Sequence, residues 1–211
     1  MRNHGKQLRR LKCHMFTTRH YQLQGVVGNK KEDIRLELFV DADSAGEHKD
    51  AKSTSRAYLV LAGTQTHFPL MWSSERQTSV NRSTTEAEVI AMANAVFGEA
   101  IPILQLFETV LERPVSLITQ EDNQATIKFV ENGCSSKLCR ISRTHQVNLG
   151  SLSEILQRGM KLQYVETDKQ AADIFTKALE PHQWPNAISL LGMQVHSQLG
   201  SSATHVADST G

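Results

Sequence analysis

The sequence predicts an α/β protein in which helices flank a mixed β-sheet. Early in the chain, apolar and polar residues alternate over several short segments, a pattern typical of antiparallel strands joined by turns. Later, helical patterns alternate with short apolar strands, and this order favours parallel strand pairing with helices on the sheet faces. The chain has 211 residues, 39% of them hydrophobic, which suits a globular domain with its own core.

The first part of the chain begins with an expected helix, in which Leu8, Leu11 and Met15 share one face. Four strands with alternating or β-branched content are then expected. The helix should cover residues 6–15 and the strands residues 21–27, 34–40, 57–63 and 68–74. The short distances between these strands favour hairpins.

A long helical pattern follows from Ser83 onward. Val89, Met92 and Val96 recur at helical spacing and form one apolar stripe. Pro102 is expected to break or kink this helix, so that a second helix starts there.

The rest of the chain alternates strands and helices. Strands are expected at 113–120 and 161–167, and helices at 123–132 (closed by Gly133), 148–159 and 170–179. Three regions result: a basic arm over residues 1–35, one domain over 36–193, and a disordered Ser/Thr/Gly/Ala-rich tail over 194–211.

Charge is distributed unevenly, although the net charge is only +1. Residues 1–35 carry nine Lys/Arg and two acids, or +7, which leaves 23 − 9 = 14 Lys/Arg and 22 − 2 = 20 acids, or −6, for the rest. A basic arm on a mildly acidic domain indicates a polyanionic partner, although short basic segments are as often simply solvated.

Several classes are disfavoured by composition. No uninterrupted apolar run approaches about 20 residues and no apolar segment follows the basic N-terminus, so neither a membrane partner nor secretion is expected. Cys13, Cys134 and Cys139 provide neither a disulfide framework nor a zinc quartet. An intracellular location, in cytoplasm or nucleus, is therefore expected.

Four carboxylates stand at predicted strand ends or helix starts: Asp41, Glu88, Asp122 and Asp173. Hydrolysis of a phosphodiester by two metal ions needs several carboxylates that converge on ions about 4 Å apart. Mg²⁺ prefers such hard oxygen ligands. Each aspartate alone also fits a structural role, namely an Asx-turn, a helix N-cap and a first helical turn in chain order.

Helix geometry separates Glu86 from Glu88. Ser83 and Glu86 fit a capping box, with Ser83 at the N-cap and Glu86 at N3, so Glu86 is given a structural role. Glu88 lies about 200° further round the helix, beside the apolar stripe, where a carboxylate needs a partner or a cation. Glu88 is therefore the predicted catalytic residue.

The stretch LELFVDADSAG contains Asp41 and Asp43 one residue apart. An EF-hand calcium loop fails at Ala45 and Lys52, where it needs oxygen ligands. The Asp-Ser-Gly triplet of a retroviral-type aspartic protease is interrupted by Ala45. Asp41 is predicted to end the strand as a metal ligand, and Asp43 to lie beyond it as a turn residue.

Several motifs occur in an order that matches a known family: DADSAG, AKSTS, WSSERQTSVNRSTTEAEVIAM, EDNQATI, SRTHQVNL and ADIFTKAL. In these motifs, residues 36 to about 193 resemble the ribonuclease H domain of a copia-type LTR retrotransposon Pol polyprotein. The basic stretch before residue 36 resembles the C-terminal end of the preceding reverse-transcriptase region.

This resemblance implies a ribonuclease H-like fold with a five-stranded mixed sheet. It implies a site with two Mg²⁺ ions, or Mn²⁺ instead, that cuts the RNA strand of an RNA–DNA hybrid. The family's four catalytic acids and metal ligands match Asp41, Glu88, Asp122 and Asp173. The hybrid and the reverse-transcriptase domain of the polyprotein are the expected partners, and no small-molecule substrate is expected.

Substrate contacts are expected at hydroxyl, amide and guanidinium groups near these acids. The predicted residues are Ser73, Ser74, Arg76, Gln77, Ser83, Thr84, Asn123, Gln124 and Arg143, with Lys52 as a further phosphate contact. Ordinary turn and capping chemistry accounts for most of them equally well.

The sequence departs from the family at a few positions. Arg56 stands where the family has glycine, Ser44 replaces a tryptophan, and His145 and Asn148 replace a lysine and an aspartate. The alternative is therefore a catalytically weak or inactive remnant that only binds nucleic acid. An integrase-type transferase is the least favoured class. Its catalytic order is Asp, Asp, Glu, whereas in this sequence the glutamate, Glu88, comes second.

Overall fold

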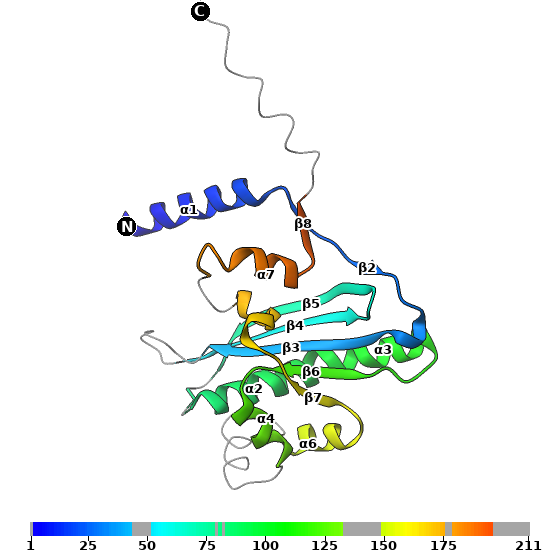
Figure 1. Cartoon of the computed structure of the whole chain (residues 1–211). Coiled ribbons are helices and arrows are strands. Elements are labelled where there is room, and N and C mark those ends of the chain that lie inside the picture. Colours follow the sequence, from blue (N-terminus) through cyan, green and yellow to red (C-terminus); the bar gives the residue numbers. More distant parts are fainter. Residues whose placement is uncertain are drawn as a thin grey trace, which may run out of the picture.

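The computed structural model describes residues 2–43, 52–78, 80–81, 83–132, 149–175 and 179–195. Its centre is a mixed sheet of six strands in the order β2-β5-β4-β3-β6-β7 (Figure 1). The strands are β2 (Val26–Val27), β3 (Arg35–Asp43), β4 (Thr54–Ala62), β5 (Thr66–Arg76), β6 (Leu117–Glu121) and β7 (Lys161–Tyr164).

The strands that come early in the chain pair antiparallel, and the later strands pair parallel. β3 pairs antiparallel with β4, and β4 with β5, whereas β3 pairs parallel with β6, and β6 with β7. The predicted α/β class with a mixed sheet is therefore confirmed. The expected count of five strands is short by one, because the two-residue β2 adds to β5 at the sheet edge.

The helices on one face of the sheet are α2 (Thr84–Ala95), α3 (Ile101–Leu111), α4 (Gln124–Glu131) and α6 (Leu149–Gln157), as Figure 1 shows. Leu36, Leu38 and Val40 alternate along β3 and pack with buried α2 residues in the main core. The opposite face carries a smaller core around Tyr58 and Val60. Because side chains alternate across a strand, odd-numbered β3 residues and even-numbered β4 residues face this second core.

Pro102 does not break the long helix, although a second α-helix, α3, does begin beside it at Ile101, as expected. A π-helical segment, η2 (Val96–Ala100), joins α2 to α3, and the backbone N–H of Ile101 bonds to the carbonyl of Val96, five residues back. The wider turn leaves Pro102 in the first positions of α3, where a missing N–H costs little.

The continuous helix Thr84–Leu111 has 28 residues, and an 18-residue window in it reaches a mean hydropathy of 1.6. By length and composition alone it could cross a membrane, although it contains no uninterrupted apolar run of about 20 residues. Here 44% of that window is buried, and α2 packs against β3 and β4 as a core helix does.

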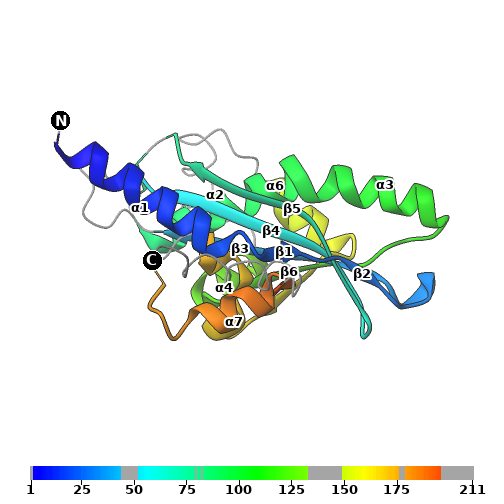
Figure 2. The same ribbon diagram turned by 90° about the horizontal axis from the view of Figure 1, so that it is seen from above.

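The two ends of the described chain meet. β1 (Tyr21–Leu23) pairs antiparallel with β8 (Met193–Val195) in a separate two-stranded sheet. The predicted first helix is present as α1 (Arg2–Thr18), which crosses above the sheet in Figure 2. The domain boundaries at residues 35 and 193 stay a prediction.

The predicted helix over 170–179 is wrong in its described part. Residues Ala171–Phe175 form a 3₁₀ segment, η4, and an α-helix follows only at α7 (Trp184–Leu190). Two other short 3₁₀ segments are η1 (Lys31–Asp33) and η3 (Thr167–Lys169). The expected cap at Gly133 lies outside the described residues.

Asp43 is not beyond the strand end, as had been predicted. It is the last residue of β3 and pairs with Thr54 of β4. Strand pairing therefore extends two residues past Asp41, so both aspartates are held by the sheet rather than by a turn.

Candidate metal-binding nuclease site

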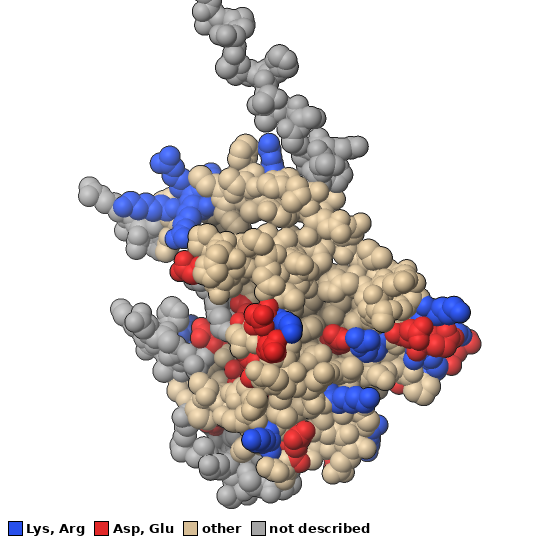
Figure 3. Space-filling model, viewed as in Figure 1, with Lys and Arg blue, Asp and Glu red and all other residues tan. Residues whose placement is uncertain are grey.

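Three predicted carboxylates line one cavity of about 510 Å³ at the end of the sheet. Asp41 comes from β3, Glu88 from α2 and Asp122 from the loop after β6. The lining also includes Ala42, Asp43, Thr84, Asn123, Gln124 and Ala125. Figure 3 shows acidic side chains at this end of the sheet and a further group at the opposite end. The carboxyl ends of parallel β3 and β6 meet here, as in other α/β sites.

Local sequence fixes where Glu88 lies. Ser83 is the N-cap of α2, and its hydroxyl accepts a hydrogen bond from the backbone N–H of Glu86 at 3.2 Å. The predicted cap is therefore confirmed. Glu88 is 6% exposed and reaches the cavity, whereas Glu86, 5% exposed, does not line it.

Glu121, the last residue of β6, is a buried carboxylate that sequence analysis did not select. It is fully buried, and its Oε1 accepts a hydrogen bond from the backbone N–H of Asn123 at 3.0 Å. Strand alternation could have found it, because Leu117, Thr119 and Glu121 share the face that packs under the helices.

Burial and mutual repulsion favour protons on these two glutamates. The pKa of Glu88 is raised to about 10, first by burial and then by the charges of Glu121, Asp41 and Asp122. A hydrogen bond from the backbone N–H of Ala42 lowers it slightly. The pKa of Glu121 is raised to about 8, again chiefly by burial. Within the described chain, Oε2 of each glutamate has no hydrogen-bond partner.

Asp122 and Asn123 have different local roles. Asn123 is the N-cap of α4, and its side-chain oxygen accepts hydrogen bonds from the backbone N–H groups of Ala125 and Thr126. Oδ2 of Asp122 accepts a hydrogen bond from the Thr167 hydroxyl at 3.1 Å. Asn123 therefore caps the helix, and Asp122 is left to line the cavity. The side-chain oxygen of Asn123, which had been predicted as a substrate contact, is already occupied by these two hydrogen bonds.

Asp173 lies on the other side of the sheet end. It belongs to η4, which packs against β3 and β4 on the face of the smaller core. Among the described residues that line the cavity, Asp173 is not included. The structure thus brings three of the four predicted acids to one cavity. The fourth, Asp173, lies outside this cavity, against the sheet face that Asp41 and Arg56 share.

The donor set suits a hard divalent cation. Carboxylate oxygens are the ligands that Mg²⁺ prefers, and the buried Oε2 atoms of Glu88 and Glu121 are of this type. In the ranges that the structure describes, however, no three His, Cys, Asp or Glu side chains are already arranged around one point. Residues that could hold an ion are Asp41, Glu88, Glu121 and Asp122, with side-chain movement toward it.

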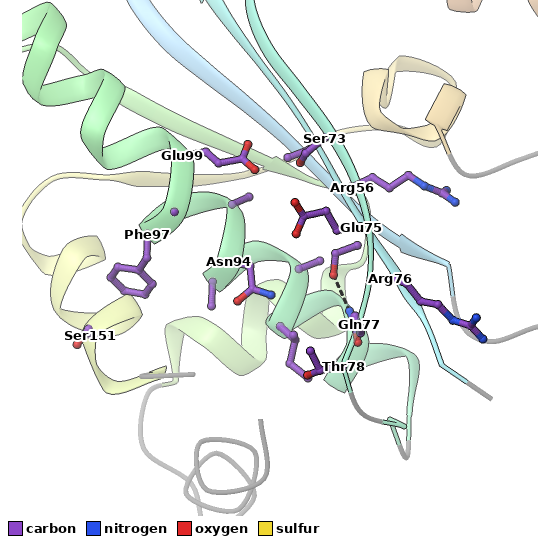
Figure 4. A pocket seen from close by; sticks show the side chains of 17 residues that line it. Arg56, Ser73, Glu75, Arg76, Gln77, Thr78, Asn94, Phe97, Glu99 and Ser151 are labelled. Atoms are coloured by element: carbon purple, nitrogen blue, oxygen red, sulfur yellow. Dashed lines mark hydrogen bonds between the residues drawn. The ribbon is translucent and has the colours of Figure 1, made fainter. Parts of the chain in front are cut away.

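The predicted substrate residues of β5 divide between the two faces. Ser73 lies opposite Ala57 and donates a hydrogen bond to Glu99, on the face that α2 and α3 cover. Ser74 lies opposite Arg56 on the Asp41 face. Figure 4 shows Ser73 beside Glu99 in a second cavity of about 750 Å³. Arg56 also lines this cavity, and its side chain points away from Ser73 and Glu99.

Other predicted contacts are less free than the sequence suggests. Gln77 is buried, and its side-chain nitrogen donates to the Ser55 hydroxyl at 2.7 Å and the Ala87 carbonyl at 2.9 Å. Arg76 is exposed at the rim of the second cavity. Ser83 and Thr84 are exposed at the start of α2, whereas Arg143 lies outside the described residues. The second cavity is larger, but none of the four predicted acids lines it, which is why the smaller one is the candidate site.

The mixed strand order, the position of α2 and the converging acids together define an α/β protein with a carboxylate-lined cavity at the end of its sheet. Two retrotransposon proteins of Arabidopsis thaliana are similar to it in sequence. They are the retrovirus-related Pol polyproteins from transposons RE1 and RE2, each 28% identical over 179 residues. The predicted resemblance to a retrotransposon Pol polyprotein is thereby confirmed. The matched region covers 80% of this chain and 11% of each polyprotein.

Solved structures give a weaker comparison. A ribonuclease H1 isolated from compost has a TM-score of 0.43 and 14% identity, covering 67% of this chain and 91% of that one. The N-terminal ribonuclease H domain of a Mycobacterium tuberculosis protein has a TM-score of 0.41 and 10% identity, covering 75% and 96%. At these low scores the superpositions carry no argument about this chain. No protein-family model matches the chain.

Proposed function

We propose that this chain is a divalent-metal-dependent endonuclease that cleaves the RNA strand of RNA–DNA hybrids. It would act as the ribonuclease H part of a retrotransposon polyprotein, in an intracellular compartment. The observation that carries the proposal is the cavity at the sheet end, where Asp41, Glu88 and Asp122 meet from three separate elements. Similarity to two retrotransposon polyproteins supports the choice of substrate.

The roles of the residues follow from their positions. Asp41 and Asp122 would hold the ions from the strand side and Glu88 from the helix side, and Asp173 would contribute from η4. When bound, Mg²⁺ or Mn²⁺ would activate a water molecule and stabilise the leaving oxygen. Glu88 must give up its proton to act as a ligand, so ion binding should release protons.

The start of α2 and the end of β5 would hold the substrate backbone. Ser83 and Thr84 are exposed at the helix N-terminus, where backbone N–H groups favour phosphate oxygens. Ser74 lies on the Asp41 face, and Gln124 lines the cavity next to Asp122. Their hydroxyl and amide groups are suited to phosphate and ribose 2′-OH contacts.

The basic arm would add affinity that does not depend on sequence. Lys6, Arg9, Arg10 and Lys12 are exposed on α1, and Figure 3 shows basic side chains clustered on this part of the molecule. Phosphate contacts release counterions, so hybrid binding through α1 should weaken steeply with salt. In a longer polyprotein, a reverse-transcriptase domain would be the natural neighbour of this arm.

The test is cleavage of an RNA–DNA hybrid with a labelled RNA strand, in millimolar Mg²⁺ and in EDTA. Purified protein should cut the RNA strand only with the metal, and Asp41→Asn, Glu88→Gln, Asp122→Asn and Asp173→Asn should each lose the activity. Asp33→Asn is the matched control, because Asp33 is exposed at the opposite end of β3. Intact hybrid after incubation with folded wild-type protein and Mg²⁺ would refute the proposal.

One observation favours the alternative, a remnant that binds nucleic acid without cutting it. The carboxylates of the described chain are not yet arranged around one ion, and Arg56 lies close to Asp41. Such a remnant would bind the hybrid with steep salt dependence and leave it uncut at every Mg²⁺ concentration. The same assay with a binding measurement therefore separates the two functions.

A further inference from the structure

Arg56 is a buried cation next to the first aspartate of the site. It lies on β4 directly opposite Asp41 of β3, so the two side chains share one face of the sheet. Its Nε donates a hydrogen bond to the hydroxyl of Ser74 on β5 at 3.1 Å, and the residue is only 8% exposed. Asp41, Arg56 and Ser74 thus form a row across three neighbouring strands.

The described residues around Asp41 differ between the two faces of the sheet end: the α2 face carries carboxylates alone, and the other face carries carboxylates together with Arg56. Glu88 and Glu121 approach from the α2 face, and the described residues that line the cavity at Glu88 include no Lys, Arg or His. On the other face, η4 brings Asp173 against β3 and β4, where Arg56 lies. The carboxylates whose charges act on Arg56 are Asp41, Asp43 and Asp173.

The guanidinium of Arg56 stays charged in this position. Burial lowers its pKa, but the three aspartates oppose this, and a guanidinium does not lose its proton in proteins. Among the described residues, Nη1 of Arg56 has no hydrogen-bond partner. A buried charge of this kind is tolerated only where opposite charges surround it. In the metal-free protein, the negative charges of Asp41, Asp43 and Asp173 therefore offset the positive charge of Arg56.

We propose that Arg56 is a built-in counter-cation of the Asp41–Asp173 half of the site, so that the chain binds one divalent ion on the Glu88 side and disfavours a second ion on the Asp173 side. The inference rests on the proposed metal-dependent function. It follows that cleavage needs more Mg²⁺ than is needed to load the first ion. At the dielectric constant of water, the repulsion between a divalent ion and a guanidinium several ångströms apart weakens ion binding about tenfold.

The experiment is a calorimetric titration of the full, EDTA-stripped chain with MgCl₂, without nucleic acid. Wild-type protein should bind one ion, with any second step at least about tenfold weaker than the first. Arg56→Gln should tighten the second step about tenfold relative to wild type. Arg56→Lys keeps the charge and should behave as wild type. Arg35→Gln removes a charge from the other end of β3 and should change nothing.

Three outcomes would contradict the inference. Equal stoichiometry and affinity in wild type and Arg56→Gln would overturn it and leave the proposed nuclease standing, provided that the hybrid is cut. Two ions bound with equal affinity by wild type would also overturn it, even if Arg56→Gln failed to fold. Absence of Mg²⁺ binding in every folded protein would overturn the metal site and the inference together.

Discussion

The buried pair Glu88 and Glu121 makes the stability of the metal-free protein depend on pH. Both pKa values are raised from 4.5, to about 10 and about 8. At pH values between 4.5 and its raised pKa, each glutamate is protonated in the folded chain and ionised in the unfolded chain. The free energy of unfolding is therefore highest below about pH 4.5 for these two groups, and it falls as the pH rises toward the folded pKa values.

The size of the effect follows from linkage. Each proton held only by the folded state lowers the free energy of unfolding by about 1.4 kcal/mol for every pH unit. From about pH 5 to about pH 8, one such proton corresponds to about 4 kcal/mol. This is a large share of the total stability of an ordinary domain, about 5–15 kcal/mol. Mg²⁺ should restore stability at high pH, because it favours the charged carboxylates.

Urea denaturation in EDTA, repeated at half-unit intervals of pH, measures this dependence. Glu88→Gln places a permanently neutral group in the same space. It should reduce the slope of the free energy of unfolding against pH by the contribution of about one proton. Glu32→Gln is the control, because Glu32 is exposed in η1, and it should keep the wild-type slope. A wild-type stability that is constant or rises over this range would refute the reasoning, as would equal slopes in wild type and Glu88→Gln.

Three further predictions concern single parts of the structure. Ser83→Ala removes the cap of α2 and should lower the free energy of unfolding by about 1 kcal/mol in urea. Tyr58→Phe removes a buried hydroxyl that bonds to the Leu191 carbonyl, and should cost about 1 kcal/mol in the same measurement. Exchanging Arg9 and Arg10 for glutamine should reduce the slope of log affinity against log salt for a hybrid by about 2. Unchanged unfolding or an unchanged salt slope would contradict the respective claim.

Sequence reasoning succeeded where a signal is local. The Ser83 cap and the position of Glu88 follow from helix periodicity within a few residues, and the structure has both. The position of Asp41 on β3 likewise follows from alternation with the buried residues Leu38 and Val40. These patterns need no knowledge of which strands pair.

It failed where neighbouring elements decide the conformation. Pro102 predicts a break or kink with a second helix after it. The second helix does start there, but a π-helical turn joins it to α2, so the helix continues without a break. Asp173 stands in a pattern that fits a helix start, yet its segment folds as a 3₁₀ turn against β3 and β4. Asp43 ends in the sheet because Thr54 of β4 reaches far enough to pair with it.

Glu121 and Arg56 show why the charge of the site could not be predicted from its four expected acids. Each lies one strand away from Asp41, so its influence depends on the pairing order of β6, β3 and β4. Glu121 adds negative charge on the helix side, which favours either a proton or a cation there. Arg56 adds positive charge on the other side, which lowers the demand for a cation. The two effects oppose one another across Asp41, so the ion affinity of the site reflects which face the ion approaches and not the number of acids alone.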